Sequence, residues 1–171
     1  MTTLYVDNIA PNLQSKISAP NLQPLAGSVI QVVQAFKYNE TSTSSTSFVD
    51  TGLSKSITPS SSSSKILVSF DFPARSNNMG VSFNVQFSTD GGSTYNTITI
   101  GGPQGWGHAV GYITGGSTAN WSHITKSYLH SPSTSNTITY KVQYKAIGSG
   151  TNCIICDSGD AALLTLMEIA G

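Results

Sequence analysis

The chain has 171 residues, in which eight Lys plus Arg balance eight Asp plus Glu, and only 9% of the residues are charged. This length suits one β-domain with its own core and is too short for two comfortable ones. The zero net charge argues against electrostatic attraction to nucleic acid. No apolar run reaches the roughly 18 residues that a membrane-spanning helix needs, so we expect no membrane insertion.

Residues 1–27 differ from the rest of the chain. They carry three prolines and isolated apolar side chains without sustained periodicity. Proline favours an extended backbone, and a disordered tail normally lacks aliphatic residues. We therefore predict an extended N-terminal attachment arm, with a disordered tail as the alternative. Its separated apolar anchors are Leu4, Val6, Ile9, Leu13, Ile17, Leu22 and Leu25.

The rest of the chain, residues 28–171, is expected to form one head domain. Its clearest segment is 81–88, where Val81, Phe83 and Val85 alternate with polar residues, as in a strand with one buried face. The Asp-Gly-Gly turn at 90–92 then predicts a hairpin.

Further strands are predicted along the head domain. Residues 137–147 alternate as cleanly as 81–88, while 48–52 and 53–58 are expected to be two short strands. Residues 161–169 are almost entirely apolar, which predicts a central strand buried on both faces; a helix is the alternative by propensity. About eight to ten short strands indicate an all-β fold, an antiparallel β-sandwich of jelly-roll type.

The two cysteines, Cys153 and Cys156, have the spacing of half a zinc site or of a redox pair. A structural zinc site needs further Cys or His ligands, and the chain has no second Cys pair. In a strand, residues three apart point to opposite faces, so the two thiols are not expected to meet. We predict buried free cysteines and no metal.

No catalytic residues are predicted. His108, His123 and His130 are the only histidines, and no Gly-x-Ser-x-Gly motif accompanies them. The candidate carboxylates for glycoside hydrolysis or calcium binding lie mostly in turns and lack the required pairing or spacing; they are Asp71, Asp90, Asp157 and Asp160. The glycine-rich loops lack the Lys of a phosphate loop, so we expect no cofactor and no enzymatic activity.

The most plausible contact surface is the glycine-rich loop at 101–107, where Trp106 stands beside His108. Such loops on a rigid β-scaffold commonly carry recognition, and Tyr112 and Trp121 add aromatic groups nearby in the sequence. Alternatively, Trp106 caps the end of the sandwich.

Several segments resemble a known family. They are Thr-Leu-Tyr-Val-Asp-Asn-Ile at 3–9, Ala-Gly-Ser-Val-Ile-Gln-Val-Val at 26–33, the run from Ser-Phe-Val-Asp-Thr-Gly-Leu-Ser to Ser-Lys-Ile-Leu-Val at 47–68, and Leu-Thr-Leu-Met-Glu-Ile at 164–169. This order is similar to that of small tail-fibre-like virion proteins of marine tailed bacteriophages, including cyanophages. The resemblance covers residues 1–68 and the closing strand, and it is weak between residues 70 and 160.

The resemblance implies a homotrimeric virion protein on the outer surface of the particle, made in the host cytoplasm. The arm would fasten it to other virion proteins of the tail or capsid. As a tail-fibre or receptor-binding protein, it would contact host surface glycan or envelope protein through Trp106, Tyr112 and Trp121. The alternative is a capsid decoration protein that clamps capsomers with its arm.

Overall fold

The computed structural model describes residues 24–98, 111–113, 121–156 and 159–171, and these residues form antiparallel strands. Within these ranges there is no helix, and so none that could cross a membrane. The strands are β1 (Val29–Lys37), β2 (Thr41–Thr43), β3 (Val49–Ile57), β4 (Lys65–Ser76), β5 (Val81–Ser88), β6 (Asn96–Thr97), β7 (Gly111–Ile113), β8 (Ser122–His130), β9 (Ile138–Ala146), β10 (Cys153–Ile155) and β11 (Ala162–Ile169).

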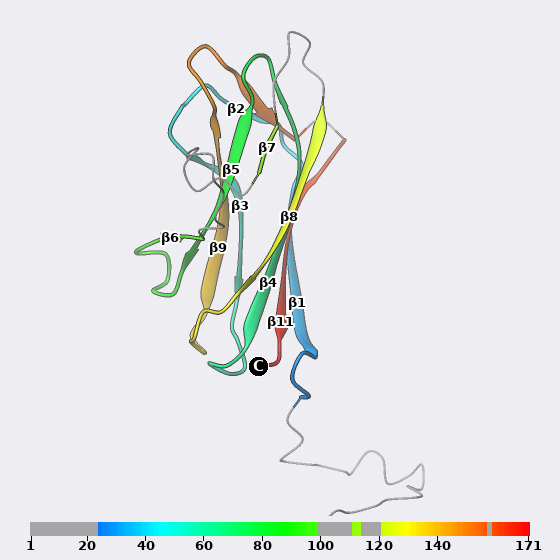
Figure 1. The fold of residues 1–171 in the computed structure, drawn as a ribbon, viewed down its shortest axis with the longest axis vertical. Helices are drawn as coiled ribbons and strands as arrows, with labels where there is room; N and C mark the ends of the chain where they lie inside the picture. The colour runs from blue at the N-terminus through cyan, green and yellow to red at the C-terminus, as the bar shows by residue number, and fades with distance from the viewer. Residues whose placement is uncertain (1–23, 99–110, 114–120, 157–158) are drawn as a thin grey trace, which may run out of the picture.

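The strands form two sheets that face each other (Figure 1). Sheet A has the order β1-β11-β4-β8. The short strand β10 pairs with the last residues of β4, past the stretch that pairs with β11, and β2 pairs with β10. Sheet B has the order β3-β9-β5, with β6 and β7 both paired to the outer edge of β5. After β2, the chain passes repeatedly from one sheet to the other, which is jelly-roll topology. The predicted jelly-roll sandwich is confirmed, and residues 162–169 are a strand rather than a helix.

The core lies between the sheets and is built from the alternating residues of the long strands. Phe83 of β5 packs on Phe72 of β4, with ring centroids 5.2 Å apart. On β9, Ile138, Tyr140 and Val142 are fully buried, as the alternation predicted. Strand β11 lies between β1 and β4, which explains why so much of it is apolar.

The prediction of two short strands at 48–52 and 53–58 is wrong, because one strand with a bulge spans this region. Asp50 lies opposite Gln143 and Ser54 lies opposite Lys141, so residues 51–53 share a single partner on β9. The buried hydroxyl of Thr51 donates to the carbonyl of Val142 at 2.7 Å and accepts from the backbone N–H of Leu53 at 3.1 Å. Gly52, with φ of 82°, marks this bulge and not a turn between strands.

The inward face of β11 ends in a carboxylate. Glu168 is 0% exposed, and it accepts hydrogen bonds from the backbone N–H and the hydroxyl of Ser60 at 2.7 and 2.6 Å and from Gln31 Nε2 at 2.6 Å. Burial alone would raise the pKa of Glu168, but the hydrogen bonds outweigh it and lower the pKa below its ordinary value. The serine-rich loop between β3 and β4 therefore closes the core at this pole.

The described chain enters and leaves the head at the same pole (Figure 1). The backbone N–H of Gly27 donates to the carbonyl of Ala170 at 2.8 Å, and the N–H of Ala170 donates to the carbonyl of Ser28 at 2.9 Å. These bonds continue the pairing of β1 with β11 past the end of both strands. They hold the start of the head directly beside its last strand.

Candidate functional site

The predicted contact residues fall mostly outside the described part of the chain. Trp106, His108 and the side chain of Tyr112 are not described. Trp121 is half-buried immediately before β8, and the guanidinium carbon of Arg75 lies 5.1 Å from its ring centroid. This cation–π contact ties Trp121 to β4 of its own domain, so one face of the ring is already occupied.

The same holds for the predicted arm. Of its apolar anchors, only Leu25 is described, and it is strongly exposed just before the head domain begins. The others lie outside the described residues: Leu4, Val6, Ile9, Leu13, Ile17 and Leu22.

The structure brings His123 together with two carboxylates that the sequence had placed far apart. Its Nδ1 lies 3.1 Å from Asp71 of β4, and its Nε2 lies 2.9 Å from Asp160, just before β11. The hydrogen bond to Asp71, assisted by Asp160, outweighs desolvation and raises the pKa of His123. Both ring nitrogens are engaged by carboxylates, so neither is free to activate a nucleophile.

His130 is held in a different environment. Its Nδ1 lies 2.8 Å from the hydroxyl of the buried Tyr140, and its ring lies 4.4 Å from that of Phe87. Burial lowers the pKa of His130 and so favours the neutral imidazole. These contacts give His130 a packing role at the edge of the core.

Cys153 and Cys156 are free and buried, as predicted. Cys153 Sγ lies 3.2 Å from the carbonyl of Gly80, and burial raises the pKa of this thiol to about 11. The expectation that the two side chains point to opposite faces is wrong, since both belong to the core. Strand β10 ends at Ile155, and the φ of 59° at Cys156 breaks the alternation on which that expectation rested.

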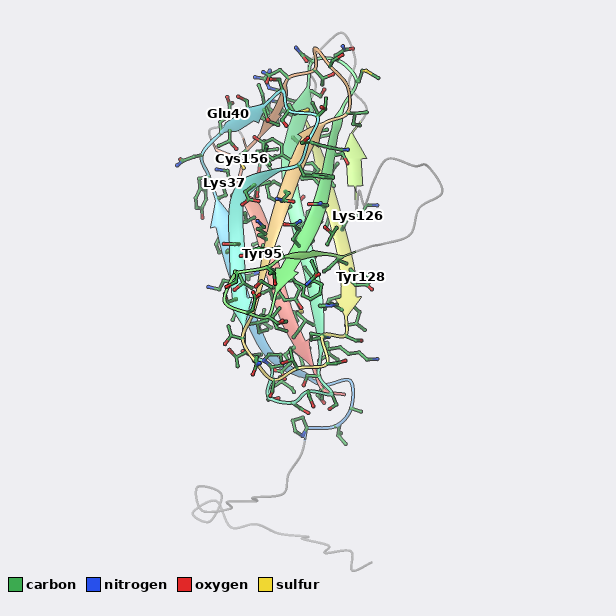
Figure 2. The ribbon with its side chains drawn as sticks, turned by 90° about the vertical axis from the view of Figure 1, so that its left-hand side faces the viewer. Lys37, Glu40, Tyr95, Lys126, Tyr128 and Cys156 are labelled. Carbon is green, nitrogen blue, oxygen red and sulfur yellow. The ribbon has the colours of Figure 1, made fainter. Side chains whose placement is uncertain are left out.

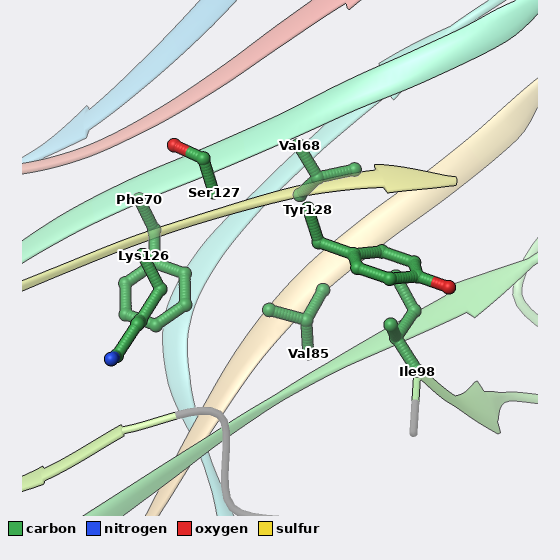
Figure 3. Close-up of a pocket in the computed structure, with 7 residues that line it drawn as sticks. All are labelled: Val68, Phe70, Val85, Ile98, Lys126, Ser127 and Tyr128. Atoms are coloured by element: carbon green, nitrogen blue, oxygen red, sulfur yellow. The ribbon is translucent and has the colours of Figure 1, made fainter. Parts of the chain in front are cut away.

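A small apolar cavity lies between the sheets, among the residues that the structure describes. At the edge where β8 faces β5 and β6, an apolar cavity of about 10 Å³ lies between Val68, Val85 and Ile98, with the ring of Tyr128 at its side (Figure 3). That volume holds one water molecule at most. Among the described residues, no group of three or more His, Cys, Asp or Glu side chains is placed to hold a metal ion.

The outward face of sheet B is polar throughout its three long strands. The outward residues are Asp50, Ser54 and Ser56 on β3, Thr139, Lys141, Gln143 and Lys145 on β9, and Ser82, Asn84, Gln86 and Ser88 on β5. On β5, however, Ser82, Asn84 and Ser88 are buried, so the expectation that only one face of residues 81–88 is buried is wrong at these positions. The polar residues of β3 and β9 are exposed or half-buried, the usual pattern of a sandwich face that meets water.

The outward face of sheet A is different. Strand pairing aligns Val32, Met167, Leu67 and Leu129 in one row across β1, β11, β4 and β8. Val32 is 49% exposed and Leu129 is 45% exposed. Phe36 and Leu163 form a second apolar pair on the same face, beyond a hydrogen-bonded polar pair, Gln34 and Thr165. We call the row of four residues the apolar row.

Sequence reasoning missed the apolar row because each strand contributes only one residue to it. The only sequence signal was the apolar character of residues 161–169 on both faces. The register of all four strands is needed to align the rest.

No protein-family model matches the sequence, and no curated protein matches it. Among solved structures, the VP2 subviral particle of infectious bursal disease virus aligns at 9% identity and a TM-score of 0.40, over 82% of this chain and 37% of that chain. Structures of the Gt and Gx strains of the same virus align at 12% and 10% identity, with TM-scores of 0.36 and 0.33. They cover 82% and 84% of this chain and 38% and 39% of those chains, so the chain spans less than two fifths of their length.

Proposed function

We propose that this chain is a non-enzymatic virion structural protein of tail-fibre or receptor-binding type, whose heads assemble as a homotrimer through the outward face of sheet A. The observation that carries the assembly is the apolar row Val32, Met167, Leu67 and Leu129. The jelly-roll fold is compatible with many functions and does not decide among them.

The two outward faces of the sandwich differ in chemistry, and this difference supports burial of sheet A. A β-sandwich in water normally places polar residues on both outer faces, and a contiguous exposed apolar surface commonly marks an interface. Removing a Leu or Met side chain from water contributes about 1.5–3 kcal/mol. The occupant proposed is a further copy of this chain, because its zero net charge gives little repulsion between copies.

The predicted arm and the resemblance to tail-fibre-like proteins support the proposal that the protein is part of the virion. The resemblance of residues 1–68 to tail-fibre-like proteins supports attachment of the arm to the particle, and the described chain enters the head at one pole, where Gly27 pairs with Ala170. The outward polar residues of β3 and β9 in sheet B are then available to the surroundings. The protein would lie on the outer surface of the virion after synthesis in the host cytoplasm.

The assembly is tested by sedimentation equilibrium of the full chain and of Leu67→Lys and Met167→Lys variants. We expect a trimer for the parent and monomers for both variants, with unchanged circular dichroism. The matched control is Ser56→Lys, which adds the same charge to an exposed position on sheet B and should remain trimeric. A monomeric parent, or variants that remain trimeric, contradict the proposal.

The location is tested by immunogold electron microscopy of intact particles, with antibody raised against residues 65–171. Label at the tail supports the tail-fibre type. Label spread over the capsid replaces it with a decoration protein, and unlabelled particles rule out both virion roles.

A further inference from the structure

A cleft of about 220 Å³ opens on the outward face of sheet B, on the opposite side of the sandwich from the apolar row. Its lining comes from β3, β9 and the turn after β5, and includes Asp50, Gly52, Ser54, Tyr95 and Lys141. Figure 2 looks onto this sheet and labels Tyr95 beside the middle of its strands. We propose that this cleft binds a neutral sugar ring through a pair of adjacent hydroxyl groups.

The cleft exists because of the bulge in β3. Residues 51–53 face only Val142, so the ladder between β3 and β9 is interrupted between Asp50 and Ser54. The interruption is fixed by the buried Thr51 hydroxyl, which bonds to Val142 and Leu53. Bulges of this kind frequently redirect side chains beside binding sites. The floor of the cleft is therefore preformed.

The polar wall of the cleft combines acceptors and donors. The carboxylate of Asp50 accepts from Gln143 Nε2 at 2.6 Å and from Lys141 Nζ at 3.1 Å, and its side chain remains 55% exposed. An ammonium group has three donors and a carboxylate has about four acceptor positions, so both retain capacity for a ligand. Because the two charges cancel, the wall suits a neutral polyhydroxy compound better than an anion or a cation.

The ring of Tyr95 forms the aromatic wall of the cleft, and it is also held in place. Lys141 Nζ lies 4.0 Å from the ring centroid of Tyr95. The turn before Tyr95 is braced by Asp90, which accepts from the backbone N–H of Thr94 at 3.0 Å and from the hydroxyl of Ser88 at 2.7 Å. An amphipathic ring next to paired donors and acceptors can contact the C–H groups and the hydroxyls of one sugar together.

Strand β9 carries a matched control. Lys145 lies over the ring of Phe48 at 4.8 Å, which repeats the cation–π contact of Lys141 with Tyr95. Neither Lys145 nor Phe48 lines the cleft. Removing this second pair changes the charge and the aromatic content in the same way, without touching the proposed site.

The test is an NMR titration of the ¹⁵N-labelled full chain with the methyl glycosides of glucose, galactose, mannose and N-acetylglucosamine. We expect at least one to shift the backbone amide signals of Gly52, Ser54 and Val142 in a saturable manner. Lys141→Ala and Tyr95→Ala should each weaken the binding about tenfold or more, whereas Lys145→Ala and Phe48→Ala should not.

The proposal is overturned if none of the four glycosides produces saturable shifts, or if both variant pairs weaken the binding equally. The sugar is titrated into Leu67→Lys as well as into the parent, and the oligomeric state of each is measured separately, so the outcome does not depend on trimer assembly. Binding that persists in monomers supports the cleft even if the assembly proposal fails.

Discussion

Ser60 donates two hydrogen bonds to the buried carboxylate of Glu168, although the two residues lie 108 positions apart in the chain. We expect Glu168→Gln to lower the free energy of unfolding by about 1–3 kcal/mol. The two carboxylate oxygens of Glu168 accept from Ser60 and from Gln31, whereas an amide has only one acceptor oxygen, so one of these donors would lose its acceptor. Urea denaturation measures the change. Ser62→Ala, in the exposed part of the same loop, is the control and should be nearly neutral; equal effects would contradict the assigned role of Glu168.

The same carboxylate should make the fold sensitive to acid. The folded-state pKa of Glu168 is lowered from the ordinary value of 4.5, so its stabilisation is fully present above that value and is lost as the pH falls through the folded-state pKa. The stability difference between the parent and Glu168→Gln should therefore shrink on acidification. A difference that is constant across the acid range would exclude this linkage.

The stabilisation that His123 gains from Asp71 and Asp160 should have the opposite pH dependence to that of Glu168. Its folded-state pKa is raised above the ordinary 6.5, so the stabilisation is present below that value and is lost as the pH rises through the folded-state pKa. The ring is half-exposed, which limits the effect to about 1 kcal/mol or less. NMR titration of the ring protons in the parent and in Asp160→Asn measures the pKa of His123. The variant should titrate at lower pH, and an unchanged titration would contradict the assigned role of Asp160.

The bulge in β3 depends on one buried hydroxyl. Thr51→Val removes the hydrogen bond to the carbonyl of Val142 and leaves the N–H of Leu53 without its acceptor, which should cost about 1–3 kcal/mol in unfolding free energy. Ser56→Ala removes an exposed hydroxyl bond to Thr139 and should cost clearly less. Denaturation of both variants in urea compares them, and equal losses would show that burial of Thr51 is unimportant.

The two thiols should be inert in the native protein. Both are buried, and the pKa of Cys153 is raised to about 11, so little thiolate forms at about pH 8. Titration with Ellman's reagent should give no rapid reaction before denaturation and two reactive thiols afterwards. Rapid reaction of either cysteine in the folded protein would contradict its assigned burial.

The fold was largely predictable because β5 and β9 alternate strictly between apolar and polar residues, which identifies both as strands. In β9 the apolar residues are also the buried ones, whereas in β5 the polar Ser82, Asn84 and Ser88 are buried as well. The bulge was not predictable. Gly52 looks like a turn in the sequence, and only the pairing of both Asp50 and Ser54 with β9 shows that one strand continues through it. Local patterning thus gave the strands but not their register.

The candidate sites were harder to predict for the same reason. Asp71 and Asp160 meet His123 from 52 and 37 positions away, and the apolar row takes one residue from each of four strands. Chemistry that depends on register across a sheet leaves no local spacing in the sequence. The aromatic residues chosen from the sequence, by contrast, include Trp121, whose ring is engaged by Arg75.

The pairing of Gly27 with Ala170 also determines how the head meets mechanical force. Tension applied at Gly27 along the axis of β1 is parallel to the long antiparallel ladder between β1 and β11. The hydrogen bonds of that ladder lie across the direction of pull, so they share the load instead of opening one after another. Under such a load the ladder is sheared, so that unfolding of the head requires many of its hydrogen bonds to break together.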